Sequence, residues 1–407
     1  MTDRALSPNP LPLAGEGDVV PLRGDAHYDI AIVGGGPVGA ALAAALAGSE
    51  YRVAVLEARD VLAAQDPRAI ALSQGARLIL ERIGAWPALA EQATPISTIH
   101  VSQRGGFGRA ELLASELGVP ALGYVTRYGD LYAALAAQLQ QSGATVSTGA
   151  QVTAIRSTSG YGAVEFHRGG VEQLLTADLV VLADGGKSLP GRQQVKDYGQ
   201  TAILCTVTTA QPHGSRAYER FTPEGPIALL PLGEAYALVW TVPNAQAEAV
   251  LGLDDAAFLA RLHDRFGDRQ GRFLTASKRA AFPLRMITSE PVQGPRILRI
   301  GNAAQTLHPV AGQGFNLGLR DAWQLGQLIW DADKPALGSA EFCMRYRDRR
   351  GPDVSGGMRM TDLMVELFSN DNFVLRHGRG VGLALMDALP PLKKAFARKM
   401  MFGAQAW

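Results

Sequence analysis

The stretch YDIAIVGGGPVGAALAAALAGSEYRVAVLE, residues 28–57, decides the fold. An apolar run, Ile30 to Val33, leads into a glycine-rich turn, an Ala/Leu-rich stretch at helical spacing and a second apolar run, Val53 to Leu56. Short apolar runs predict buried strands, and helical spacing between them predicts a connecting helix. The stretch therefore predicts a strand, a turn, a helix and a second strand, which together form a βαβ unit.

Three glycines in the turn, Gly34, Gly36 and Gly39, follow the GxGxxG spacing. The first permits a tight bend, the second lets the backbone approach a pyrophosphate, and the third lets helix and strand pack closely. Amides at the helix N-terminus then face the phosphates. Glu57 ends the second strand, where a carboxylate accepts hydrogen bonds from ribose hydroxyls. The motif predicts a dinucleotide site and leaves open whether the ligand is FAD or NAD.

The bulk composition excludes several classes of protein. A chain of 407 residues suggests two domains or one elaborated domain, and a net charge of +1 gives no electrostatic case for nucleic acid. Its two cysteines, Cys205 and Cys343, cannot form a disulfide framework or a zinc site, so we expect a reducing cytoplasm and no metal. Residues 1–26 read as a disordered tail without a secretory signal. No apolar run is long enough to span a membrane, so any membrane contact is expected to be peripheral.

Two arginines follow the βαβ unit at positions that suit a cofactor. Arg68 lies in an expected loop before a helix that includes Leu72, and its guanidinium could pair with a pyrophosphate. A solvated loop arginine is the alternative. Arg127 lies at an expected junction of strand and helix, where it could face either a cofactor or solvent.

Two further loops follow buried strands. The strand Leu179 to Ala183 ends in Asp184 and Gly185, which would place a carboxylate at the carboxyl edge of the sheet, where ligands bind. The strand Ile297 to Ile300 runs into a loop with further glycines and then a helix from about residue 316. A glycine-rich loop at a helix N-terminus offers backbone donors to an electron-rich partner. Between these loops, residues 201–285 alternate as antiparallel strands and predict a separate sheet that covers the site.

The ordered triple GGGPVG, LADGGKS and GNAAQTLHPVAGQGFNLGLRDA resembles the FAD-dependent aromatic hydroxylases, the class A flavoprotein monooxygenases. Residues 216–232, RAYERFTPEGPIALLPL, resemble the ubiquinone-biosynthesis branch of that family. The resemblance implies an α/β fold: a Rossmann-like FAD-binding domain, a second antiparallel β-sheet substrate domain and a C-terminal helical region. The FAD-binding domain would comprise residues 27–95, 125–190 and 286–340, the substrate domain residues 96–124 and 191–285, and the helical region residues 341–407.

The resemblance assigns site residues position by position. Those that match FAD contacts are Gly34, Gly36, Pro37, Gly39, Glu57, Arg68, Arg127, Asp184, Gly185, Asn302, Gly312, Gln313, Gly314, Phe315 and Asn316. Asn302 stands where most of the superfamily has an aspartate, and its amide can still hydrogen-bond the ribityl chain. Two positions depart from the family pattern: the segment around Arg127 matches loosely, and Arg192 lies four residues after Ser188, which leaves its role open.

The activity that the resemblance implies is hydroxylation of a polyprenyl phenol, of the 2-polyprenyl-6-methoxyphenol type, in ubiquinone biosynthesis. NAD(P)H would reduce FAD as a co-substrate, and O₂ would form a C4a-hydroperoxide whose distal oxygen reaches the ring. His308 could transfer a proton and the Pro309 carbonyl could face the substrate hydroxyl, or both could only shape the loop. Two other activities stay open: an FAD-dependent reductase or dehydrogenase, and a flavin-carrying scaffold subunit of a quinone-biosynthesis complex.

The C-terminal segment predicts a basic amphipathic helix. Its apolar residues Leu392, Phe396, Met400 and Met401 alternate with Lys393, Lys394, Arg398 and Lys399. Such a helix could rest on an anionic membrane or pack against the enzyme or a partner protein. We therefore expect a cytoplasmic protein with a possible peripheral contact at the inner face of the cytoplasmic membrane.

Overall fold

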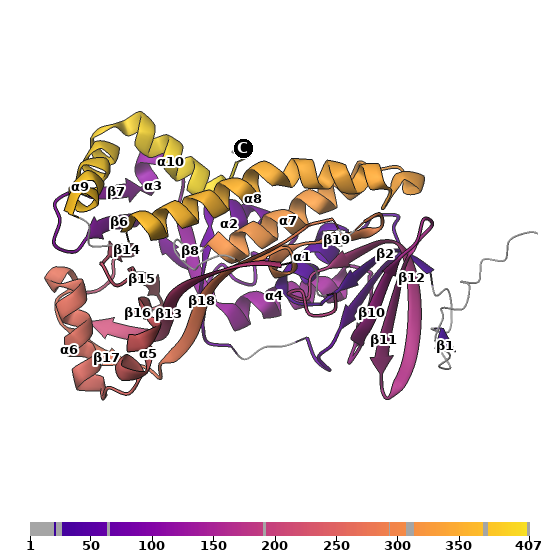
Figure 1. Cartoon of the computed structure of the whole chain (residues 1–407), viewed down its shortest axis with the longest axis horizontal. Helices are drawn as coiled ribbons and strands as arrows, with labels where there is room; N and C mark the ends of the chain where they lie inside the picture. The colour runs from indigo at the N-terminus through magenta and orange to yellow at the C-terminus, as the bar shows by residue number, and fades with distance from the viewer. Residues whose placement is uncertain are drawn as a thin grey trace, which may run out of the picture.

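The computed structural model describes residues 20–21, 27–62, 66–189, 193–292, 294–306, 313–368 and 373–404. Two large sheets lie side by side, with the long helix α8 running above them (Figure 1). His308, Pro309, Gly312 and Arg192 lie outside the described residues. Of the predicted tail, only residues 20–21 are described, and they pair as strand β1 with the first sheet.

The first sheet has eight strands within the described residues. Its order is β10 (Gln151–Ser157), β11 (Gly162–Arg168), β12 (Val171–Leu182), β2 (His27–Val33), β3 (Val53–Glu57) and β9 (Thr145–Thr148), and β1 (Val20–Pro21) and β19 (Ile297–Arg299) also pair with β12. The strands β19, β12, β2, β3 and β9 run parallel, so their carboxyl ends share one edge. The three glycine-bearing loops all leave from this edge.

In the part of the chain that the structure describes, the second sheet has nine strands and is antiparallel except where β14 pairs with β6. Its order is β20 (Gln305–Thr306), β18 (Ala280–Ser289), β13 (Gln193–Thr209), β16 (Ala235–Pro243), β15 (Ile227–Leu232), β14 (Arg216–Phe221), β6 (Thr98–Gln103) and β7 (Arg109–Leu113), and β17 (Phe273–Ala276) pairs with β13. A third, three-stranded sheet contains β4 (Ala69–Ser73), β8 (Gly123–Arg127) and β5 (Thr94–Ile96).

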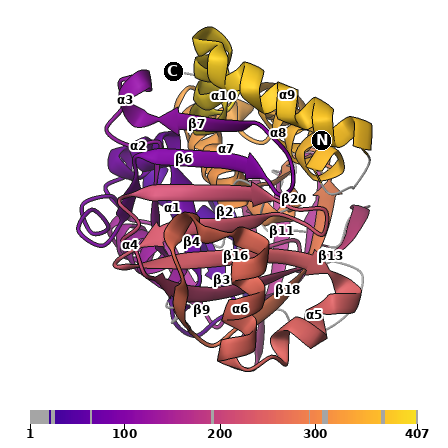
Figure 2. The same ribbon diagram turned by 90° about the vertical axis from the view of Figure 1, so that its left-hand side faces the viewer.

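Ten α-helices occur in the described residues. They are α1 (Pro37–Ala45), α2 (Gln74–Arg82), α3 (Ala114–Leu117), α4 (Tyr128–Gln141), α5 (Asn244–Leu251), α6 (Asp255–Phe266), α7 (Gln313–Trp330), α8 (Ala340–Phe368), α9 (Phe373–Ala388) and α10 (Pro390–Phe402). Short 3-10 helices are η1 (Asp268–Gln270), η2 (Gly301–Ala303) and η4 (Lys334–Ala336). Figure 2 shows the second sheet with α6 in front of it and α9 and α10 along its β7 edge.

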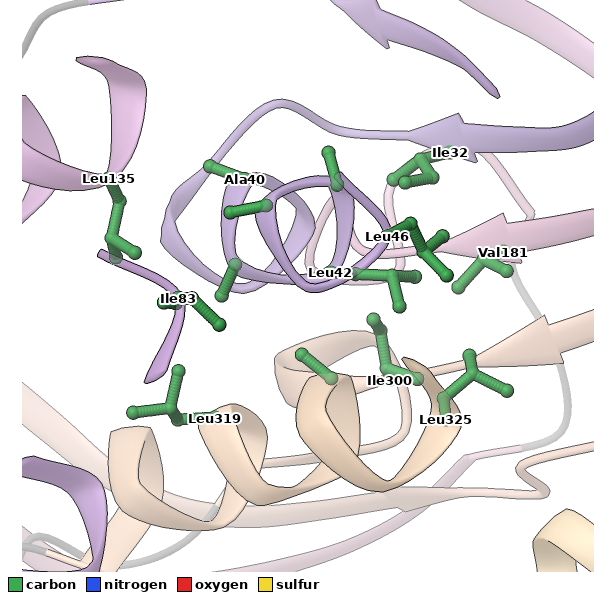
Figure 3. Packing of buried hydrophobic residues seen from close by; sticks show 14 of the residues in the cluster. Ile32, Ala40, Leu42, Leu46, Ile83, Leu135, Val181, Ile300, Leu319 and Leu325 are labelled. Atoms are coloured by element: carbon green, nitrogen blue, oxygen red, sulfur yellow. The ribbon is translucent and has the colours of Figure 1, made fainter. Parts of the chain in front are cut away.

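The core that positions the site is the contact between α1 and α7 (Figure 3). Small residues let the two helices approach closely: a Cβ on Gly326 would lie 3.1 Å from the Cβ of Ala45, and one on Gly318 would lie 3.0 Å from Cγ2 of Val38. Leu42 from α1 is fully buried here, and burial of such a side chain stabilises the fold by about 1.5–3 kcal/mol. The N-termini of both helices are thereby held at the same edge of the first sheet.

The structure confirms the expected fold class: a Rossmann-like α/β unit, a second, mainly antiparallel sheet and a helical C-terminal region. Two local expectations were wrong. Leu72 lies on strand β4 and not in a helix, because residues 69–73 pair with β8. The strand that contains Leu179 begins earlier than expected: β12 runs from Val171 to Leu182 and pairs with β11 at its start and with β2 along its second half. The domain boundaries stay a prediction.

Candidate functional site

A cavity of about 1010 Å³ lies between the carboxyl edge of the first sheet and one face of the second. Ligand pockets usually measure roughly 300–1,000 Å³, so this cavity is large enough for a dinucleotide with a second molecule beside it. Eleven of the predicted site residues line it: Gly34, Gly36, Pro37, Glu57, Arg68, Asp184, Gly185, Asn302, Gly314, Phe315 and Asn316. The structure thus brings together three loops that are far apart in the sequence. The roles of these residues stay a prediction.

The three glycines of the first loop have different structural roles. Gly34 has φ +105°, and a Cβ there would lie 2.7 Å from the amide nitrogen of Asp184. A Cβ on Gly39, beneath the loop, would overlap the carbonyl oxygen of Gly34. A Cβ on Gly36 would meet no described protein atom within 4 Å, and Gly36 faces the cavity at the N-terminus of α1. The fold itself therefore requires Gly34 and Gly39, whereas Gly36 leaves room for a ligand.

The acid at the end of β3 is held in place by a basic residue that the sequence reading missed. Glu57 is buried and accepts hydrogen bonds from the Gly35 amide (2.8 Å) and from the amide and Nε of Arg59 (3.0 and 2.7 Å). Burial raises the pKa of Glu57, but the bonds from Arg59 and Gly35 lower it more, so the net pKa is below its ordinary value. Arg59 also donates to the Tyr132 hydroxyl (2.9 Å). A basic residue two positions after the ribose acid was the signal that could have identified Arg59.

The two arginines suggested as cofactor contacts lie in different surroundings. Arg68 lines the cavity, with its guanidinium bound to Asp66 (Nε to Oδ2, 2.8 Å) and 5.1 Å from the ring of Phe282. Arg127 does not line the cavity: its side chain is 60% exposed and 4.0 Å from the carboxylate of Asp130. Because side chains alternate along β8, the buried Thr126 faces inward and Arg127 faces solvent. This geometry does not support the cofactor contact expected for Arg127.

The second loop is organised by its own carboxylate. Asp184 lines the cavity and accepts hydrogen bonds from the amides of Gly186 (2.9 Å) and Ser188 (2.7 Å) and from the Ser188 hydroxyl (2.5 Å). Arg299, from the neighbouring strand β19, donates through Nη2 to the Leu189 carbonyl (2.6 Å). Burial lowers the pKa of Arg299, partly offset by the charge of Asp184. Arg299 was not predicted, because a lone arginine in an apolar strand gives no sign of the loop it holds.

The third loop is anchored from α7. Asp321 accepts hydrogen bonds from the Gly301 amide (2.9 Å) and the Gln305 side chain (2.6 Å), so it fixes the turn that carries Asn302. Arg350 from α8 binds the other oxygen of Asp321 (2.7 Å). The turn that presents Asn302 to the cavity is therefore supported by buried charges.

Helix α7 begins at the cavity, where its first amides have no partner within the helix. Gly314, Phe315 and Asn316 line the cavity, and a Cβ on Gly314 would meet no described protein atom within 4 Å. The side chain of Asn316 binds β4, accepting from the Ser73 amide (2.9 Å) and donating to the Ala71 carbonyl (3.0 Å). Asn316 thus links α7 to the small sheet. Gln313 begins the helix.

The second sheet contributes an apolar wall. Its aliphatic cavity residues are Ile99, Val101, Leu112, Leu204, Ala217, Ala228, Leu230 and Val239, and its polar ones are Tyr218, Glu219 and Thr306. Burial raises the pKa of Glu219 to about 7. The cavity therefore has a polar half at the glycine loops and an apolar half at this wall.

Helix α10 closes the apolar half. Phe396, Ala397, Met400 and Met401 line the cavity, together with Met364 from α8. Lys393 is buried and holds the helix by an ion pair with Glu116 (3.0 Å). The amphipathic pattern was thus read correctly as a helix, but Phe396, Met400 and Met401 point inward and are not a membrane-facing surface.

These residues fit FAD. Two helix N-termini and an open glycine provide backbone donors for phosphates and for the electron-rich edge of a flavin, and Glu57 keeps lone pairs for a ribose. The apolar wall gives room for an oily molecule beside the ring.

Comparison with known proteins agrees with this geometry. A family profile described as an FAD binding domain matches residues 27–340. Ubiquinone hydroxylase UbiL of Rhodospirillum rubrum is 33% identical over 94% of this chain and 91% of its own length. The 3-demethoxyubiquinol 3-hydroxylase of Escherichia coli is 31% identical over 90% of this chain and 96% of its own length. The crystal structure of p-nitrophenol 4-monooxygenase from Pseudomonas putida shares the fold, with a TM-score of 0.72 at 17% identity over 93% of this chain and 98% of that one.

Proposed function

The chain belongs to the FAD-binding-domain family that contains the ubiquinone hydroxylases, and from this premise we propose that it is an FAD-dependent monooxygenase that hydroxylates the ring of a polyprenyl phenol in ubiquinone biosynthesis. The observation that carries the proposal is the single cavity, in which three glycine-bearing loops meet an apolar wall.

FAD, when bound, supplies the redox chemistry: once reduced by NAD(P)H, it activates O₂ for transfer of one oxygen atom to the ring. The chain's own residues bind, orient and exclude water. Gly36 and the start of α1 would hold the pyrophosphate, and Glu57 a ribose. The start of α7 and Asn302 would hold the flavin end.

NAD(P)H is proposed as a transient co-substrate. The sequence contains no second GxGxxG that would give the nicotinamide a Rossmann site of its own. His308 and the Pro309 carbonyl stay proposed, from the sequence, as candidates to meet the substrate hydroxyl, a role for which the cavity also offers a described residue, Glu219.

The apolar cavity wall formed by the second sheet indicates the class of substrate. Eight aliphatic side chains of the second sheet and the methionines of α8 and α10 suit a phenol with an isoprenoid chain better than a charged benzoate. An oily chain of this kind transfers favourably from water to such a surface.

A membrane is proposed as the source of that substrate, and α9 as the contact surface. Val381, Leu385, Leu389 and Leu392 are between 47% and 51% exposed, and they recur at helical spacing from α9 into α10. Residues 373–404 carry six lysines and arginines against one aspartate, and Lys394, Arg398 and Lys399 are exposed, which suits an anionic surface. No helix in the described part of the chain is long and apolar enough to cross a bilayer.

The test uses the purified flavin-loaded protein with NADH or NADPH and a phenol that carries a short isoprenoid chain. We expect the phenol to accelerate NAD(P)H oxidation and the new hydroxyl to contain oxygen from ¹⁸O₂. Product oxygen from water, or reduction of the phenol's quinone without O₂ uptake, would replace the hydroxylase with a reductase. Normal ubiquinone levels in cells whose protein cannot bind FAD would indicate a scaffold subunit.

A further inference from the structure

Among the described residues, Glu219 is the one acidic residue in the cavity face of the second sheet. It lies on β14 in a row of residues that pair across five strands, between Val101 of β6 and Ala228 of β15, with Val239 and Leu204 beyond. All five line the cavity, and the other four are aliphatic. The next row, around Ala217, is also aliphatic. A carboxyl group is therefore presented by a rigid sheet into the apolar half of the cavity.

No hydrogen bond or ion pair joins the carboxyl group of Glu219 to another described residue. The two other carboxylates of the cavity differ in this respect, because Glu57 and Asp184 each accept bonds from backbone amides of their own loops. Burial alone raises the pKa of Glu219 to about 7, with no charged neighbour contributing. The group can therefore gain or lose a proton near neutral pH.

The other charged groups of the cavity belong to its polar half. Arg59 is bound to Glu57 and Arg68 to Asp66, and Lys187 lies in the loop after β12. The helices α8 and α10 contribute Met364, Phe396, Ala397, Met400 and Met401, none of which titrates. Tyr218, the neighbour of Glu219, receives its hydrogen bond from Gln270. His308 lies outside the described residues.

We propose that Glu219 binds the hydroxyl of the phenol substrate and accepts its proton during ring hydroxylation. The inference rests on the proposed function and names the residue that orients and activates the ring. A phenol whose hydroxyl meets Glu219 would lie against the aliphatic row, with its isoprenoid chain toward the methionines of α8 and α10.

Each proton in the proposed reaction has a source and a destination. The carboxylate takes the O–H proton, which leaves a phenolate whose ortho and para carbons are richer in electrons. One oxygen atom from O₂ adds at such a carbon, the ring C–H proton is lost as the ring regains aromaticity, and Glu219 returns its proton to the phenolate oxygen. NAD(P)H with one solvent proton supplies two electrons and two protons. Together with the ring proton, these give the hydrogen of the new hydroxyl group and the two hydrogens of the water in which the second oxygen atom leaves. General-base assistance of this kind usually contributes roughly 10²–10⁴-fold.

The test compares Glu219→Gln, Glu219→Asp and a control, Glu234→Gln, in the flavin-loaded protein. Glu234 lies in the exposed turn between β15 and β16 of the same sheet, so it undergoes the same chemical change away from the cavity. We expect Glu219→Gln to keep its flavin and its reduction by NAD(P)H but to lose roughly 10²- to 10⁴-fold in kcat for hydroxylation. The rise of wild-type kcat with pH through about 7 should disappear. Glu219→Asp should retain that rise, because it keeps an acid at the site.

A second readout needs no turnover. 4-Nitrophenol changes colour on ionisation, so its absorbance when bound reports whether the protein takes its proton. We expect the bound probe to ionise at lower pH in wild-type than in Glu219→Gln. Equal ionisation in the two proteins, with an equal pH profile for hydroxylation, overturns the role of Glu219 and leaves the hydroxylase intact. A wild-type protein that hydroxylates no phenol overturns the proposed function instead.

Discussion

Replacing Gly36 by alanine tests whether this glycine is required for ligand binding or for folding. Gly36 has φ −65° and ψ 179°, a conformation that alanine adopts without strain, and its Cβ would meet no described protein atom within 4 Å. The flavin-free variant should therefore be as stable as wild-type, or more stable by about 0.4–1 kcal/mol because its unfolded chain is less flexible. If the pyrophosphate lies against this residue, the added methyl group overpacks the complex by about 1–3 kcal/mol, which is roughly five- to 150-fold in Kd.

The assay is titration of flavin-free protein with FAD, followed by flavin fluorescence, alongside urea unfolding curves of the same preparations. Gly160→Ala is the matched control, because Gly160 lies in an exposed bend away from the cavity and its Cβ also meets open space. Gly39→Ala should lose stability even without FAD, because its Cβ overlaps the Gly34 carbonyl. Wild-type affinity for FAD in Gly36→Ala would refute the placement of the pyrophosphate.

Three further predictions address charge and surface. His100 is buried, and burial and a nearby arginine lower its pKa to about 4. The unfolded chain therefore binds a proton at this histidine first as pH falls below 6.5, and this group should lower the free energy of unfolding by about 2 kcal/mol between pH 7 and 5. Urea unfolding of His100→Gln should lack that drop. An unchanged pH dependence in the variant contradicts this. Arg350→Met should cost about 3–5 kcal/mol in urea unfolding, because it leaves the buried carboxylate of Asp321 without its cation and Asp353 with Arg320 alone, whereas Arg347→Met at an exposed pair should cost about 0–1 kcal/mol. Similar costs for the two would show that the buried network is not needed. The double variant Leu385→Asp, Leu389→Asp should bind phosphatidylglycerol vesicles at least about tenfold more weakly, measured by co-sedimentation, without a change in FAD affinity. Unchanged co-sedimentation would exclude α9 as the membrane contact.

The parts of the site that the sequence predicts are those governed by local rules. A glycine spacing between two apolar runs defines the turn at Gly34, and a glycine-rich loop before a helix defines the start of α7. Because parallel strands end at one edge, it also follows that the loops after β2, β12 and β19 meet. The location of the polar half of the cavity was therefore predictable, and the roles of its residues stay a prediction.

The features that the sequence does not predict depend on the direction in which a side chain or the apolar side of a helix points in the folded protein. Alternation along β8 directs Arg127 to solvent, and pairing with β8 makes a strand of the segment around Leu72. The pattern of α10 is the same whether its apolar side meets a membrane or a cavity, and only the packing shows that Met400 points inward. Arg299 acts through the backbone carbonyl of Leu189, and Arg59 joins Glu57 to Tyr132, a residue far along the chain.

Replacement of Glu219 is expected to change the stability of the protein and its activity in opposite directions. A carboxyl group whose pKa rises from 4.5 to about 7 on folding binds its proton more tightly in the folded state. Its stability contribution is therefore greatest at low pH and is lost as pH rises through 7, up to the order of 3 kcal/mol. In ligand-free protein at pH 8, Glu219→Gln should raise the free energy of unfolding measured in urea, although the same variant is expected to lose hydroxylation. A glutamate that only supported the fold would show the reverse, with lower stability and unchanged chemistry, and that result would remove Glu219 from the site.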